Sequence, residues 1–148
     1  MDIKIVLTNF SAVDWSGHTT WDIDDKLDTV KQSPGKTLDK YSGREVLWIV
    51  RETLSWYVDG HSKCSTMWST NNGAELFGVS VYAPFQFLTM GAAPHWGYGM
   101  NDAHGKWGWT DQAADQSAPF TITTSSGRQA RIQPTCAHSS ISLDVQIT

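Results

Sequence analysis

The chain has 148 residues, of which 11 are Lys or Arg and 15 are Asp or Glu, so that its formal net charge is −4. Hydrophobic residues make up 40% of the chain and charged residues 18%, which excludes intrinsic disorder, and the two cysteines exclude a disulfide-dense miniprotein. No apolar run approaches the roughly 20 residues of a membrane-spanning helix, and the mild acidic excess without clustered Lys or Arg argues against nucleic acid as a partner.

Apolar residues at every second position predict strands along most of the chain. The first such segment covers residues 3–7, and the last covers residues 141–147. The same pattern recurs between them in residues 46–50, 54–58, 77–87, 120–124 and 130–132. Asn72-Gly73 and Ser126-Gly127 are typical hairpin turns. The sequence therefore predicts one all-β domain over residues 1–148, a two-sheet antiparallel β-sandwich with one short helix.

The segment from Asp22 to Gln32 departs from the period of two and is the predicted helix. Its apolar residues Ile23, Leu27 and Val30 follow one another at spacings of four and three, as on one face of a helix. Asp22 is a suitable N-cap residue. We therefore expect a short helix over residues 22–32.

Aromatic residues concentrate in one region of the chain. Eight of the 17 Phe, Trp and Tyr residues lie in the 33 residues from Phe77 to Trp109. Residues 77–88 alternate and are expected in the core, whereas residues 94–109 are rich in glycine and are expected to form a surface loop. Exposed Trp and Tyr side chains mark contact surfaces, which makes this loop the candidate binding site. The alternative is that its aromatic rings fold back and cap one end of the sandwich.

The candidate ligand-binding residues combine aromatic rings with polar groups. They are Trp96, Tyr98, Trp107, Trp109, Asp102, His95 and His104. Trp107 and Trp109 lie two residues apart, so an extended backbone turns both indoles to one side, and Trp96 or Tyr98 would complete the platform. Such a platform suits one face of a sugar ring or, through cation–π attraction, the ammonium group of a choline headgroup.

These residues favour a non-enzymatic recognition protein, either lectin-like or headgroup-binding, that contacts membranes peripherally. No cofactor is expected, and no metal either, because the spacing of His95, His104, Asp102 and Asp111 matches no zinc signature. One alternative is a small β enzyme with an aromatic pocket, in which His95 or His104 is the general base and Asp102 or Asp111 orients it. Another alternative is a homo-oligomer whose subunit interface covers the aromatic patch.

The N-terminal residues and the cysteines bear on the compartment. The segment that begins Met1-Asp2-Ile3-Lys4 has neither the basic nor the apolar region of a classical signal peptide. We expect a cytoplasmic location, or secretion without such a signal. Cys64 and Cys136 are accordingly expected to remain reduced rather than to pair.

Several segments together resemble the actinoporin-like cytolysins and fungal lectins of similar architecture. The opening strand is followed by Asn9-Phe10-Ser11 and then by Trp15. Residues 73–79 have the sequence Gly-Ala-Glu-Leu-Phe-Gly-Val, and Pro84-Phe85 precedes the aromatic loop. The chain ends with a strand of regular alternation over residues 140–148. The resemblance covers about half of the chain. It implies a compact sandwich whose aromatic cluster binds a phosphocholine headgroup or a glycan, as in a toxin component. The amphipathic pore-forming helix that precedes the first strand in that family has no counterpart here, so the resemblance does not extend to pore formation.

Overall fold

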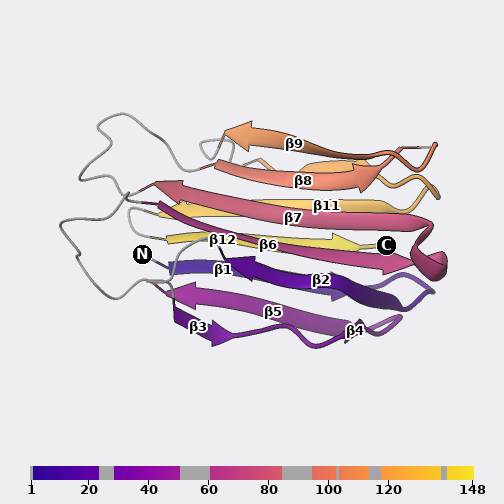
Figure 1. The fold of residues 1–148 in the computed structure, drawn as a ribbon, viewed down its shortest axis with the longest axis horizontal. Helices are drawn as coiled ribbons and strands as arrows, with labels where there is room; N and C mark the ends of the chain where they lie inside the picture. The colour runs from indigo at the N-terminus through magenta and orange to yellow at the C-terminus, as the bar shows by residue number, and fades with distance from the viewer. Residues whose placement is uncertain are drawn as a thin grey trace.

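The computed structural model describes residues 2–23, 29–50, 61–84, 95–102, 104–113, 118–137 and 140–148. Within these residues the chain forms two six-stranded sheets, which lie one in front of the other (Figure 1). The predicted all-β, two-sheet sandwich is thereby confirmed. The predicted strand at residues 54–58 and the part of the predicted core segment beyond Pro84 lie outside the described residues.

Sheet A has the strand order β10-β11-β12-β1-β5-β3. Its strands are β10 (Phe120–Thr123), β11 (Gln129–Ala137), β12 (Ser140–Ile147), β1 (Asp2–Asn9), β5 (Gly43–Val50) and β3 (Thr29–Gln32). The pairs are antiparallel with one exception: β1 and β12 run parallel, from Asp2 beside Ser140 to Asn9 beside Ile147. The predicted antiparallel sandwich thus contains one parallel pair, which the sequence pattern does not reveal because period-two alternation is the same for either strand direction.

Sheet B has the strand order β4-β2-β6-β7-β8-β9, and its paired strands are all antiparallel. Its strands are β4 (Thr37–Leu38), β2 (Trp15–Ile23), β6 (His61–Thr70), β7 (Glu75–Pro84), β8 (His95–Asn101) and β9 (Trp107–Ala113). In this order β9 lies at one edge of the sheet, paired with β8, and this edge carries the candidate site.

The core fills the space between the two sheets. Sheet A contributes mainly aliphatic side chains, namely Ile3, Ile5, Leu7, Leu47, Ile49, Ile132, Ile141, Leu143, Val145 and Ile147. Sheet B contributes larger rings, namely Trp15, Trp68, Phe77 and Trp96, beside Val79 and Val81. Burial of such side chains, at roughly 1.5–3 kcal/mol each, is the main force that holds the sheets together.

The predicted helix over residues 22–32 is wrong where the structure describes it. Asp22 and Ile23 belong to β2 and pair with Ser65 and Cys64 of β6. Thr29–Gln32 is β3, which pairs with β5. Residues 24–28, including Leu27, lie outside the described residues. A helix of this length is marginal on its own, and pairing with β6 and β5 satisfies the backbone hydrogen bonds of the described residues instead.

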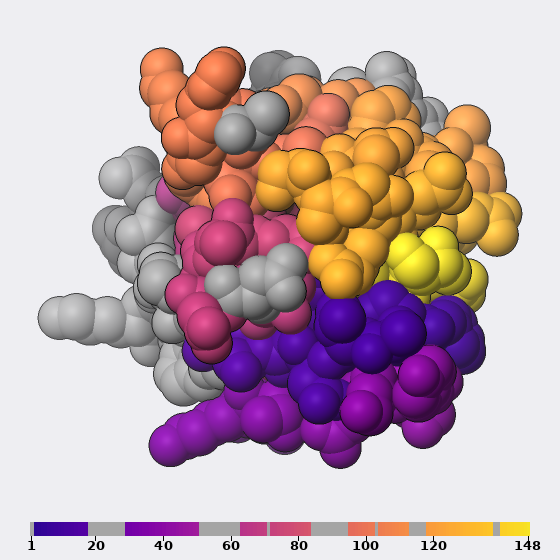
Figure 2. Space-filling model, turned by 90° about the vertical axis from the view of Figure 1, so that its right-hand side faces the viewer, coloured from indigo at the N-terminus to yellow at the C-terminus, as the bar shows by residue number. Residues whose placement is uncertain are grey.

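Turns of both sheets meet at the end of the sandwich that Figure 2 views. The β6–β7 turn contains the 3-10 turn η1 (Asn71–Gly73), in which Asn72 and Gly73 have φ values of 54° and 88°. The β10–β11 turn places Gly127 at φ 86°. Both turns therefore use residues that tolerate the left-handed region, and both predicted hairpins are confirmed.

The Glu75 carboxylate joins these two turns across the sandwich. It lies at the start of β7 with its side chain 2% exposed, and it forms a salt bridge with Arg128 of the β10–β11 turn. The hydroxyl groups of Thr124 and Ser126 donate hydrogen bonds to the same carboxylate. A buried charge is tolerated only when it is paired and hydrogen-bonded, and both conditions are met here.

The two cysteines lie in different sheets and form no disulfide with each other. Cys64 is buried in β6, whereas Cys136 is exposed in β11. Within the described residues, no helix has the length and apolar character needed to cross a membrane.

Candidate aromatic binding site

The glycine-rich segment that was expected to be a surface loop is instead the β8–β9 hairpin. The pairing runs from His95 opposite Ala113 to Asn101 opposite Trp107. The turn between the strands is held by Asp102, whose Oδ1 accepts the backbone N–H groups of His104 and Lys106 at 2.8 and 2.9 Å. Asp102 was predicted to bind a ligand, and the structure shows that its side chain stabilises the turn. Pro94 lies outside the described residues.

Trp96 and Tyr98 face the core side of sheet B. Trp96 is 1% exposed and packs edge-on against Phe120, with ring centroids 6.1 Å apart. Tyr98 is half-buried against the core, 5.5 Å from the same ring. For these two residues the capping alternative describes the structure, because their rings close the space between the sheets next to β10. Neither ring can complete a platform with Trp107 and Trp109, which lie on the opposite face of the sheet.

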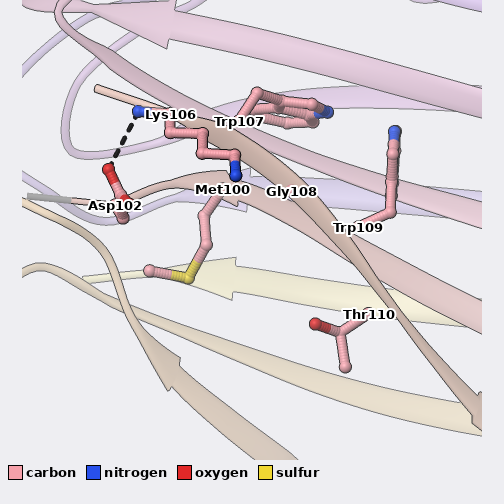
Figure 3. A pocket seen from close by; sticks show the side chains of 7 residues that line it. All are labelled: Met100, Asp102, Lys106, Trp107, Gly108, Trp109 and Thr110. Atoms are coloured by element: carbon pink, nitrogen blue, oxygen red, sulfur yellow. Dashed lines mark hydrogen bonds between the residues drawn. The ribbon is translucent and has the colours of Figure 1, made fainter. Parts of the chain in front are cut away.

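Trp107 and Trp109 lie together on the outer face of sheet B. Their ring centroids are 5.3 Å apart and their planes meet at 86° (Figure 3). Trp109 is 43% exposed and Trp107 is half-buried. The prediction that an extended backbone turns both indoles to one side is therefore confirmed.

Two glycines on neighbouring strands make room for this indole pair. A Cβ atom on Gly99 would lie 2.2 Å from Cζ2 of Trp107, so the indole occupies the space of the absent side chain. On Gly78, opposite Gly99, a Cβ atom would lie 3.3 Å from the Trp109 ring and 3.4 Å from the Trp107 ring. The glycines form a floor that supports both indoles from the sheet side.

Replacing Gly99 by alanine is expected to displace the Trp107 indole, because a methyl group at 2.2 Å cannot coexist with it. Overpacking of this kind costs about 1–3 kcal/mol of stability. The displaced indole should change the near-ultraviolet circular dichroism that arises from the Trp pair. Gly108→Ala is the matched control, since its Cβ would meet no atom within 4 Å. If Gly99→Ala has the spectrum and the melting temperature of the wild type, the glycines do not determine the position of the indole pair.

A shallow hollow of about 280 Å³ lies at the edge strand beside the pair (Figure 3). Polar groups line it together with the indoles, among them Asp102, Lys106 and Thr110. The side chains of Met100 (β8) and Thr110 (β9) project to the opposite side of the sheet in the same view. The hollow is open to solvent and suits a small ligand that rests against the indoles rather than one that is enclosed.

The two predicted histidines do not share a site. His95 begins β8 and stacks on Tyr82 with ring centroids 4.7 Å apart, whereas His104 is exposed in the turn beyond the other end of β8. About 20 Å of strand separates them, from a rise of roughly 3.4 Å per residue. Within the described residues, no group of three or more His, Cys, Asp and Glu side chains is placed to hold a metal ion. The two histidines therefore lie at opposite ends of β8 and cannot contact one ligand of the size of a single sugar ring.

Comparison with known proteins adds no relative: no protein-family model matches the chain, and the curated proteins include no significant match. The assignment of the candidate site therefore depends on its geometry alone. Sequence reasoning found Trp107 and Trp109 but missed their glycine floor, because the register that pairs Gly78 of β7 with Gly99 of β8 does not follow from the spacing of residues within one strand.

Proposed function

We propose that this protein is a non-enzymatic recognition protein that binds a glycan through Trp107 and Trp109. The observation that carries the proposal is the exposed indole pair, which rests on the Gly78–Gly99 floor in the rigid outer face of a sheet. A surface that presents a large exposed indole in a fixed orientation loses little conformational entropy when it binds a ligand.

Sugar rings match this surface in shape and in chemistry. One face of a hexose carries C–H groups that stack on an indole, while its hydroxyl groups point outward to polar partners. Lys106 and Asp111 are exposed close to the pair and can donate or accept such hydrogen bonds. The hollow beside β9 is open, which suits the end or the side of a longer glycan.

A choline-type headgroup is the second candidate, and the angle between the indoles favours it. Planes that meet at 86° form two walls of a corner in which a quaternary ammonium group can contact both rings. Each cation–π contact is worth roughly 0.5–2 kcal/mol. Either ligand would bring the protein to a membrane surface that displays it.

Trp109→Ala is expected to weaken ligand binding by about 30-fold, which corresponds to about 2 kcal/mol for a desolvated aromatic anchor. The melting temperature should change little, because Trp109 is 43% exposed. A glycan array and pelleting with phosphatidylcholine vesicles identify the ligand class. Competition by monosaccharides or by free phosphocholine then separates the two candidates.

Trp48→Ala is the matched control for this experiment. Trp48 is 36% exposed but lies on β5 in the other sheet, where its Nε1 donates a hydrogen bond to Asp2. The proposal is contradicted if wild type and Trp109→Ala bind equally well to the glycan array or to the vesicles. It is also contradicted if the wild type binds to neither. If Trp109→Ala instead dissociates an oligomer in light scattering, the pair is a subunit interface.

A further inference from the structure

A strip of side chains continues from the indole pair along the outer face of sheet B. The pairing of β7, β8 and β9 places three successive rows across this strip. They are Gly78–Gly99–Trp109, then Ser80–Gly97–Asp111, then Tyr82–His95. Alternate residues of a strand point to one face, so these rows share the face of the indoles and lie opposite Trp96.

The middle row brings two polar groups together above a glycine. A Cβ atom on Gly97 would lie 2.9 Å from Oγ of Ser80 and 3.0 Å from Oδ1 of Asp111. The hydroxyl and the carboxylate therefore converge over the position where Gly97 lacks a side chain. Asp111 is exposed, so its carboxylate can accept hydrogen bonds from a ligand.

The last row is a second aromatic surface. The rings of Tyr82 and His95 stack with centroids 4.7 Å apart and planes 18° from parallel, and both are half-buried. His95 lies four residues before Gly99 on β8, which is about 13 Å along an extended strand. Two aromatic surfaces thus flank one hydrogen-bonding site, at a separation longer than a single sugar ring.

We propose that this strip binds an uncharged, extended oligosaccharide of the β1→4-linked type, which lies along β8. This inference rests on the proposed glycan-binding function and specifies the class of glycan. A β1→4-linked chain forms a flat ribbon whose rings can stack at intervals on one sheet face, whereas an α-linked chain coils away from it. The Asp111 carboxylate in the middle accepts hydroxyl or amide hydrogens and repels an acidic sugar.

The length dependence of binding tests this inference. Titration calorimetry is carried out with cello-oligosaccharides and chito-oligosaccharides from the disaccharide to the hexasaccharide. Wild-type affinity should rise about tenfold with length once a second aromatic surface is engaged. His95→Ala should abolish this gain and leave the disaccharide affinity unchanged. Asp111→Ala, at an exposed position where folding is not at risk, should weaken the longer ligands as well.

The outcomes separate this inference from the proposed function. The inference that the strip binds an extended oligosaccharide is wrong if the wild-type affinity does not depend on the length of the ligand. It is also wrong if the gain in affinity with length persists in both His95→Ala and Asp111→Ala. If Trp109→Ala still weakens binding in that case, glycan recognition by the indole pair stands. If the wild type binds neither series, the inference about β1→4-linked chains is wrong, and the glycan array decides whether the indole pair binds another glycan. If Trp109→Ala binds both series as the wild type does, the inference and the proposed function fail together.

Discussion

Replacing Trp96 by alanine is expected to lower the free energy of unfolding by about 3–5 kcal/mol, the usual cost of a deleted core indole. Trp96 is 1% exposed, and its ring packs on Phe120 and Tyr98 between the sheets. A loss of this size is a large fraction of the stability of a domain, about 5–15 kcal/mol. Urea denaturation followed by far-ultraviolet circular dichroism measures it.

Two variants of the same hairpin serve as controls for this result. Trp96→Phe should cost much less stability, since it keeps an aromatic ring in the core, and the buried Nε1 of Trp96 has no hydrogen-bond partner among the described residues. Trp109→Ala should lower the free energy of unfolding least of the three, because that indole is exposed on the outer face. If Trp96→Ala melts like the wild type, the assignment of Trp96 to the core and of Trp109 to the surface is wrong.

Arg128→Ala is expected to cost about 3 kcal/mol or more, because it leaves a buried carboxylate without its counter-charge. The Glu75 side chain is 2% exposed, whereas that of Arg128 is 22% exposed. Thermal unfolding at neutral pH measures the loss. The effect should be larger than that of a surface ion pair, which is worth roughly 0–1 kcal/mol.

Glu75→Gln should rescue much of this loss when it is combined with Arg128→Ala. Thr124 and Ser126 both donate to Oε1 of Glu75, and the amide oxygen of glutamine can accept both hydrogen bonds without a charge. The double variant is therefore expected to be more stable than Arg128→Ala alone, which a double-mutant cycle quantifies. Additive losses would indicate that Glu75 and Arg128 do not interact in the folded protein.

The fold could be predicted from the sequence where side chains alternate cleanly. β1 and β12 show the strict alternation of aliphatic residues that a strand with one buried face requires. β6 escaped prediction because His61–Thr70 is largely polar, and its buried face combines Cys64 and Trp68 with Thr66 and Thr70. The helical spacing in residues 22–32 was misleading because tertiary pairing outweighs the preference of a short segment.

The candidate site could be predicted only in part for a related reason. The common direction of Trp107 and Trp109 follows from two-residue spacing within one strand. Which face each aromatic residue occupies depends on the register between strands, and Trp96 and Trp109 end on opposite faces of one hairpin. The glycine content of this segment predicted a loop, but composition does not show where each glycine lies in a sheet. Gly99 lies within a strand and makes room for an indole.

The parallel pairing of β1 with β12 has a consequence for how the chain reaches its native state. β1 is the first described strand to be synthesised, yet one of its two neighbours in sheet A is the last. Proteins dominated by such distant pairings fold in milliseconds to seconds, because much chain entropy is lost before contacts form. Until β12 has left the ribosome, one edge of β1 carries unpaired N–H and C=O groups beside the apolar residues Ile3, Ile5 and Leu7. That edge is where the unfinished chain is most exposed to pairing with another copy of itself.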